Sequence, residues 1–78
     1  MNKERRESLL DVTATLSEAM DRLGEIRDEE QEAFDNMPEG LQCSARGDSM
    51  QNAIDTMDDW CDQIDGLINK IETEGRFL

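Results

Sequence analysis

The sequence has no histidine and no tyrosine, and it has only one proline, one tryptophan and two cysteines in 78 residues. The absence of histidine excludes a histidine catalyst and a histidine metal ligand. Eight basic residues stand against twenty acidic ones, which argues against direct binding of nucleic acid because phosphates are held mainly by cations. No run approaches the roughly 18 apolar residues that a membrane span requires, so we expect no membrane contact.

A chain of 78 residues forms one domain at most and buries a modest share of its surface. Such small domains often gain stability from disulfides, metals or oligomerisation. The start of the chain lacks the basic segment, apolar run and small-residue cleavage site of a secretory leader. We therefore expect a soluble protein in which Cys43 and Cys61 are reduced thiols, although whether they ever pair stays open.

The net charge of −12 is unevenly distributed along the chain. Residues 1–27 hold 5 basic and 6 acidic groups, whereas residues 28–78 hold 3 basic and 14 acidic groups. Acidic chains with few aromatic residues can be disordered. Here the apolar residues recur too regularly for that, and their spacing favours long helices.

The first apolar pattern alternates spacings of three and four residues and has one charged member, Glu30. This heptad pattern predicts a helix that ends near Met37, because proline at position 38 disfavours helical backbone before it. Met20 and Phe34 widen the stripe on one side. The predicted seam consists of Leu9, Val12, Leu16, Ala19, Leu23, Ile26, Glu30, Ala33 and Met37.

The second half of the chain carries a broader apolar face. Asp48 with Gln51 suits a capping box, and Gly75 suits the left-handed residue just past a helix end. The chain is thus predicted to be a single all-α helical-hairpin domain, with helices at about 3–37 and 48–74 and a loop at 38–47; a start at Ser44 is the alternative. The face consists of Met50, Ala53, Ile54, Met57, Trp60, Cys61, Ile64, Leu67, Ile68 and Ile71.

One partner helix is too narrow to cover this face, and exposed apolar patches usually mark interfaces. We expect the hairpin to pair with itself, as a dimer or tetramer, in a homo-oligomeric four-helix bundle. The alternative is that the face is kept for a different protein. The predicted oligomer interface comprises Leu16, Leu23, Met57, Trp60, Ile64 and Leu67.

A row of aspartates lies opposite the apolar face of the second helix. Aspartate is a poor residue inside a helix, and like charges on adjacent turns repel each other. A solvated surface is the plain interpretation, but the cost to stability suggests a function. Acids one turn apart, about 5.4 Å, imitate the spacing of phosphates and would attract a basic protein surface. These predicted partner-binding residues are Asp55, Asp58, Asp59, Asp62 and Asp65.

A second cluster, Glu25, Asp28, Glu29 and Glu32, has the helical spacing with which carboxylates hold Mg²⁺. It resembles the acidic motif of the all-helical nucleotide pyrophosphohydrolases, and that resemblance implies a magnesium-dependent enzyme as the alternative function. The chain departs from the family, because no second inward-facing acidic pair and no nucleotide-binding basic and aromatic groups are present. Under the main interpretation no cofactor is expected and the protein is not an enzyme.

Glu30 is the one charged residue of the predicted seam, and an unpaired buried carboxylate is unfavourable. It can reach Arg27, reach an arginine of another subunit, or lie where the bundle opens to water. The motif Arg46–Asp48 has the letters of an integrin-binding loop, which we attribute to chance.

The run EEQEAFDNMPEGLQ at 29–42, followed by Ser44 to Gly47 and an acidic helix, resembles a segment of small acidic proteins of phages and related mobile elements. The resemblance covers roughly residues 25–70 and implies a compact helical hairpin in the cytoplasm of a bacterial host. It transfers no catalytic residue. Some acidic phage proteins block host nucleases by imitating DNA, so we expect a non-enzymatic inhibitor or regulator of a basic host protein. A third possibility is an assembly adaptor that acts through its apolar face.

Overall fold

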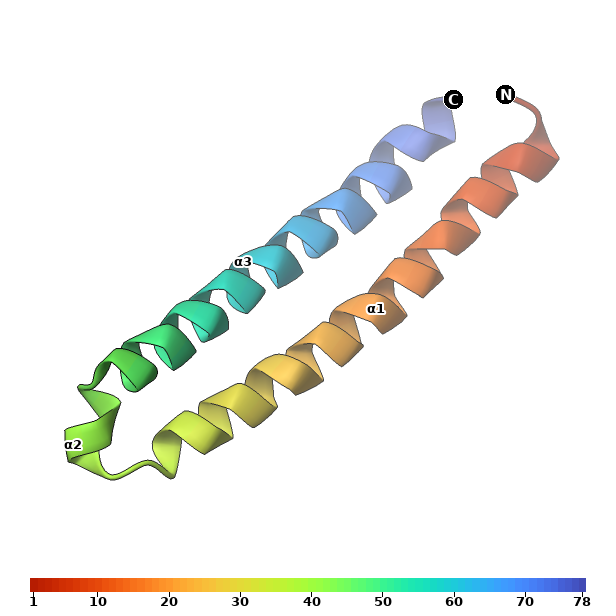
Figure 1. Cartoon of the computed structure of the whole chain (residues 1–78). Helices are drawn as coiled ribbons and strands as arrows, with labels where there is room; N and C mark the ends of the chain where they lie inside the picture. Colours follow the sequence, from red (N-terminus) through yellow and green to blue (C-terminus); the bar gives the residue numbers. More distant parts are fainter.

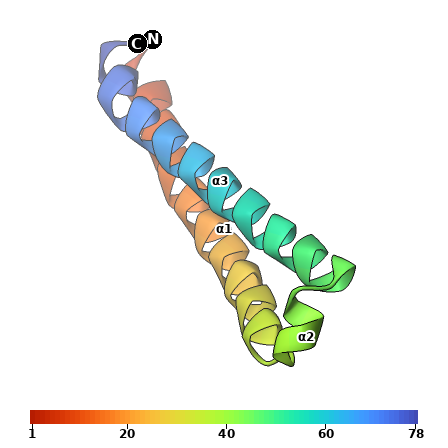
Figure 2. The same cartoon turned by 90° about the vertical axis from the view of Figure 1, so that its left-hand side faces the viewer.

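The computed structural model describes all 78 residues as two long antiparallel helices joined at one end (Figure 1). The elements are α1 (Lys3–Asp35), α2 (Glu39–Gln42) and α3 (Ala45–Glu74), followed by a 3-10 turn, η1 (Gly75–Phe77). There is no strand, so the all-α prediction is confirmed. The molecule measures 59 × 15 × 12 Å. Both termini lie at one end and α2 at the other, and α1 and α3 lie side by side in both views (Figures 1 and 2).

Polar side chains and Pro38 set the ends of α1. The Asn2 side chain accepts a hydrogen bond from the backbone N–H of Arg5 at 2.8 Å and so caps the helix. The helix ends at Asp35, two residues before the predicted Met37. Pro38 is the cap residue just before α2, and its carbonyl accepts hydrogen bonds from the backbone N–H groups of Leu41 and Gln42. This four-residue helix was not predicted, because so short a segment shows no apolar period.

The start of α3 differs from the prediction. Ser44, the alternative, is the cap: its side chain accepts from the backbone N–H of Gly47, and Asp48 lies in the first turn. Gly47 is buried, and a Cβ on it would lie 2.0 Å from the carbonyl oxygen of Gln42. A glycine is therefore required where the last carbonyls of α2 approach the first turn of α3. Gly75 is not left-handed as predicted, since its φ of −59° lets the chain continue into η1.

The core of the hairpin lies along one seam of α3. Ile54 is 1% exposed, and Met57 and Ile68 are 9% exposed. The other apolar residues of that seam are half-buried, and α1 contributes no fully buried residue. Met37, just past the end of α1, is half-buried too. The half-buried residues of α1 are Arg6, Leu9, Leu10, Thr13, Leu16, Ser17, Met20, Leu23, Gly24, Arg27, Glu30, Gln31 and Phe34.

The predicted seam of α1 is therefore wrong at every second position. Thr13, Met20, Arg27 and Phe34 face α3 and are half-buried, one residue after the positions that were expected there. A shift of one residue at alternate seam positions corresponds to a rotation of about 50° around the helix axis. The rotation brings the long side chains of this column onto α3 and turns a predicted column outward. The outward column consists of Val12, Ala19, Ile26 and Ala33, all exposed.

Candidate functional site

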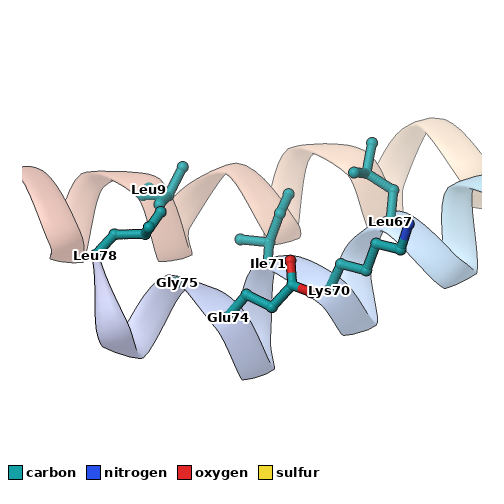
Figure 3. Close-up of a pocket in the computed structure, with 7 residues that line it drawn as sticks. All are labelled: Leu9, Leu67, Lys70, Ile71, Glu74, Gly75 and Leu78. Atoms are coloured by element: carbon teal, nitrogen blue, oxygen red, sulfur yellow. The ribbon is translucent and has the colours of Figure 1, made fainter.

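Two sets of contacts show which residues share a side of the hairpin. Arg27 of α1 donates from Nε to Asp58 of α3 at 2.8 Å, and its Nη1 lies 3.4 Å from Asp28. At the open end, Leu9 of α1 lines a groove together with Leu67 and other residues of α3 (Figure 3). Because residues seven apart stay on one side of paired helices, these contacts assign the remaining residues to two opposite sides.

All five predicted partner-binding aspartates of α3 are exposed and lie on or beside the side marked by Asp58. Asp58 is engaged by Arg27. Asp55 accepts a hydrogen bond from Gln51 at 3.0 Å, and Asp59 accepts one from Gln63 at 2.7 Å. Asp62 and Asp65 have no hydrogen-bonding partner within the chain.

The first helix contributes nine acids to this side and to the outer face that adjoins it, which the sequence interpretation missed. Asp28 lies beside Asp58 through Arg27, and Glu7, Asp21 and Asp35 stand at multiples of seven residues from Asp28. The other acids of α1 form the adjoining column, three or four residues from these. The spacing is visible in the sequence. It places these acids beside Asp58 only when the face of α1 that contacts α3 is known. We call this surface the acidic side; its members are Glu4, Glu7, Asp11, Glu18, Asp21, Glu25, Asp28, Glu32 and Asp35 of α1 and Asp48, Asp55, Asp58, Asp59, Asp62, Asp65 and Glu72 of α3.

Arg27 is the cation that joins the two acidic rows. The side-chain hydrogen bond with Asp58 is the main cause that raises the pKa of Arg27 above its ordinary value, and Asp28 adds to it. Its side chain is 28% exposed, against 52% for Asp58. Arg27 is therefore a permanent positive charge on α1 that bonds to α3 through Asp58.

The alternative magnesium ligands do not form a convergent site. Glu25, Asp28, Glu29 and Glu32 are all exposed on α1, and no three acidic or thiol side chains of the chain lie close enough together to hold a metal ion. No carboxylate of α3 joins them. The arrangement therefore gives the enzyme interpretation no geometric support.

Glu30, at a position of the predicted seam, is half-buried. It forms no ion pair with Arg27, whose guanidinium bonds to Asp58 and Asp28 instead. No basic group of the chain lies within ion-pairing distance of it. The two other interpretations, a cation of a second subunit or an opening to water, stay predictions.

The side opposite the acidic side is apolar. Trp60 is 51% exposed and Leu67 is 47% exposed, whereas Leu16, Leu23 and Ile64 of the predicted interface are half-buried. Met57, also of the predicted interface, lies inside the hairpin and is only 9% exposed. We call this surface the apolar side; its exposed and half-exposed members are Val12, Ala19, Ile26 and Ala33 of α1 and Ala53, Trp60 and Leu67 of α3.

A groove of about 190 Å³ lies at the end of the apolar side that is near the termini (Figure 3). It is lined mainly by apolar side chains, with one charged residue of each sign, Lys70 and Glu74, at its edge. No nucleophile, thiol or paired carboxylate faces it. The groove therefore offers apolar contact and no evident chemistry.

Both cysteines are free thiols: Cys43 is exposed in the connection and Cys61 is half-buried in the seam of α3. No helix of the chain is both long enough and apolar enough to cross a membrane.

No protein-family model, curated protein or solved structure matches the chain. The arguments for function therefore rest on the two sides of the hairpin.

Proposed function

We propose that the chain is a non-enzymatic acidic binding module, which assembles with itself into a four-helix bundle and engages a basic protein surface through the acidic side. The observation that carries the proposal is the sorting of charge. Sixteen of the twenty acidic residues lie on the acidic side, drawn from both long helices. The same half of the molecule holds four basic residues, Lys3, Arg6, Arg27 and Arg76, and Arg27 is already paired with Asp58.

The mechanism is electrostatic. Acids recur along each helix at about one turn, roughly 5.4 Å, so two parallel rows of negative charge run along one surface. Rows of this kind attract a basic groove over long range and raise the rate of association. Unpaired aspartates such as Asp62 and Asp65 are free to accept hydrogen bonds from lysine or arginine. Such a surface competes with DNA for a nucleic-acid-binding protein, as an inhibitor or regulator.

The test compares two triple variants that change the net charge equally. Asp55→Asn, Asp59→Asn and Asp62→Asn together remove three charges from the acidic side but leave the Arg27–Asp58 bridge intact. Glu29→Gln, Glu30→Gln and Glu74→Gln remove three charges from elsewhere. Each protein is immobilised and exposed to a bacterial lysate, and the captured proteins are identified by mass spectrometry.

We expect the wild type and the glutamine variant to capture the same basic protein, and the asparagine variant to lose it. Capture should weaken steeply with added salt, because exposed charges are screened, and added double-stranded DNA should compete. Capture that is indifferent to salt, to DNA and to the three aspartates would overturn the proposal.

A further inference from the structure

We propose that the apolar side is the contact surface for a second copy of this chain, in a two-fold dimer that turns the two acidic sides outward. The inference rests on the oligomeric part of the proposed function and deepens it, because it names the surface that pairs and the number of acidic surfaces that result.

The apolar side is exposed in the single hairpin, although its residues are of the kind that proteins bury. Ile26 is 54% exposed and Val12 is 43% exposed, whereas Ile54 in the seam is 1% exposed. Trp60 alone offers on the order of 150–250 Å² of largely apolar surface, half of it uncovered here. These residues come from both helices and form one continuous side, which marks an interaction surface.

The hairpin exposes more surface than a compact protein of its mass, and the excess is about the area that one partner would cover. The hairpin exposes 5827 Å². A compact monomer of 8.9 kDa exposes about 4,800 Å² on the usual scaling of surface with mass. The excess, about 1,000 Å², is close to the roughly 800 Å² that each partner contributes to a stable interface. One hairpin placed on the apolar side would therefore bring the surface of each chain near that of a compact protein.

The distribution of charge selects a second copy as the occupant. The half of the surface that holds the apolar side carries four basic residues, Arg5, Arg22, Arg46 and Lys70, against three acidic ones, Glu29, Glu30 and Glu74. The net charge of this half is +1. The rest of the chain therefore has a net charge of −13, which gives the total of −12. Two copies therefore repel each other everywhere except on the apolar side, where the charges nearly cancel and apolar contact can hold them together.

The pairing has a consequence for binding. A two-fold axis makes the contact isologous, so the same side is buried in both copies. The acidic sides then lie on opposite outer surfaces of a four-helix bundle. The dimer presents two equivalent acidic surfaces and binds two copies of a basic partner.

The closing experiment uses glutamate substitutions on the two sides of α1. Ile26→Glu places a charge on the apolar side, and Ala14→Glu places the same charge on an exposed position in line with the acids Glu7 and Asp21. Both positions are exposed in the hairpin, so neither change disturbs its core. Leu67→Glu repeats the apolar-side test on α3. Far-ultraviolet circular dichroism confirms that each variant is helical.

The readouts are mass by sedimentation equilibrium and the emission of Trp60, the one tryptophan in a chain without tyrosine. The wild type and Ala14→Glu should sediment at twice 8.9 kDa at micromolar concentration, with blue-shifted Trp60 emission that moves to the red on dilution. Ile26→Glu and Leu67→Glu should be monomers with red-shifted emission. A monomeric or tetrameric wild type, or equal masses for Ile26→Glu and Ala14→Glu, would overturn the inference. A dimer that captures no basic protein would keep the interface and remove only the proposed acidic function.

Discussion

The two long helices pack along the same line, yet only α3 buries residues completely. The seam of α3 is continuously apolar, from Met50 to Ile71. The seam of α1 includes Thr13, Arg27 and Glu30, and its apolar residues are divided between the seam and the exposed column that contains Ile26. The comparison teaches that α3 holds the single hairpin together, whereas α1 divides its apolar residues between α3 and a second surface.

Truncation of an isoleucine should have very different effects in the two helices. Ile54→Ala in α3 removes a fully buried side chain and should lower the free energy of unfolding by about 2–5 kcal/mol. Ile26→Ala in α1 removes an exposed side chain and should change it by less than about 0.5 kcal/mol in a monomeric sample. Urea titration followed by circular dichroism measures both. Equal losses would show that α1 is as deeply packed as α3.

Alanine in place of glycine should have opposite signs in the two helices. Gly47→Ala in α3 forces a Cβ against the carbonyl of Gln42 and should cost about 1–3 kcal/mol or more. A Cβ at Gly24 in α1 would meet nothing within 4 Å, so Gly24→Ala should stabilise the helix by about 0.5–1 kcal/mol. Thermal melts of the two variants give the comparison. A stabilising Gly47→Ala would contradict the close approach of α2 and α3.

Charge reversal should stabilise α3 more than α1. Asp62 has three acids one turn away, Asp58, Asp59 and Asp65, and each repulsion that becomes an attraction contributes about 0.2–0.5 kcal/mol. Asp62→Lys should therefore raise stability at low salt, and under the proposed function it should also weaken capture of a basic protein. Asp21→Lys, with two acidic neighbours on α1, should gain less. Melts at low and high salt check this, because screening should remove both gains.

The smallest effect is expected at the bridge between the helices. Arg27→Gln removes the ion pair with Asp58, and a part-exposed pair of this kind contributes little to stability. We expect a slightly lower melting temperature, by less than for Gly47→Ala. The pKa of Arg27 is raised, so its contribution is complete below the ordinary arginine pKa and is lost only as pH rises through the higher value. The difference from wild type should hence stay constant between about pH 7 and pH 10. A difference that vanishes within that range would contradict the role given to Arg27.

Much of the fold follows from local signals in the sequence. Pro38 marks the end of the first helix region, and the seven-residue repeats from Leu9 and from Met50 define two helices that must pair. The exact seam of α1 does not follow. Two apolar columns lie side by side on it, and one of them contains Arg27 and Thr13, so a single sequence favours the wrong column. The choice depends on packing against α3 and on the bridge to Asp58, neither of which is local.

The acidic side was predicted only on α3. Its aspartates are adjacent along one helix, whereas the acids of α1 are interleaved with arginines and serines. Whether the acids of α1 belong to the acidic side depends on which face of α1 contacts α3, and the sequence alone does not give that face. The need for glycine at position 47 could not be seen in the sequence for a similar reason, because it comes from the backbone of Leu41 and Gln42 at the end of α2.

The antiparallel arrangement of the helices also sets an order of folding. Gln42 bonds to the carbonyl of Phe34 across 8 residues, Arg27 bonds to Asp58 across 31, and Leu9 lines one groove with Gly75 near the two ends of the chain. Closing a longer loop loses more chain entropy, so contacts should form first at the α2 end and close progressively toward the termini. Unfolding should begin at the open end. Amide hydrogens around Leu9 and Ile71 should therefore exchange with solvent before those around Ile54.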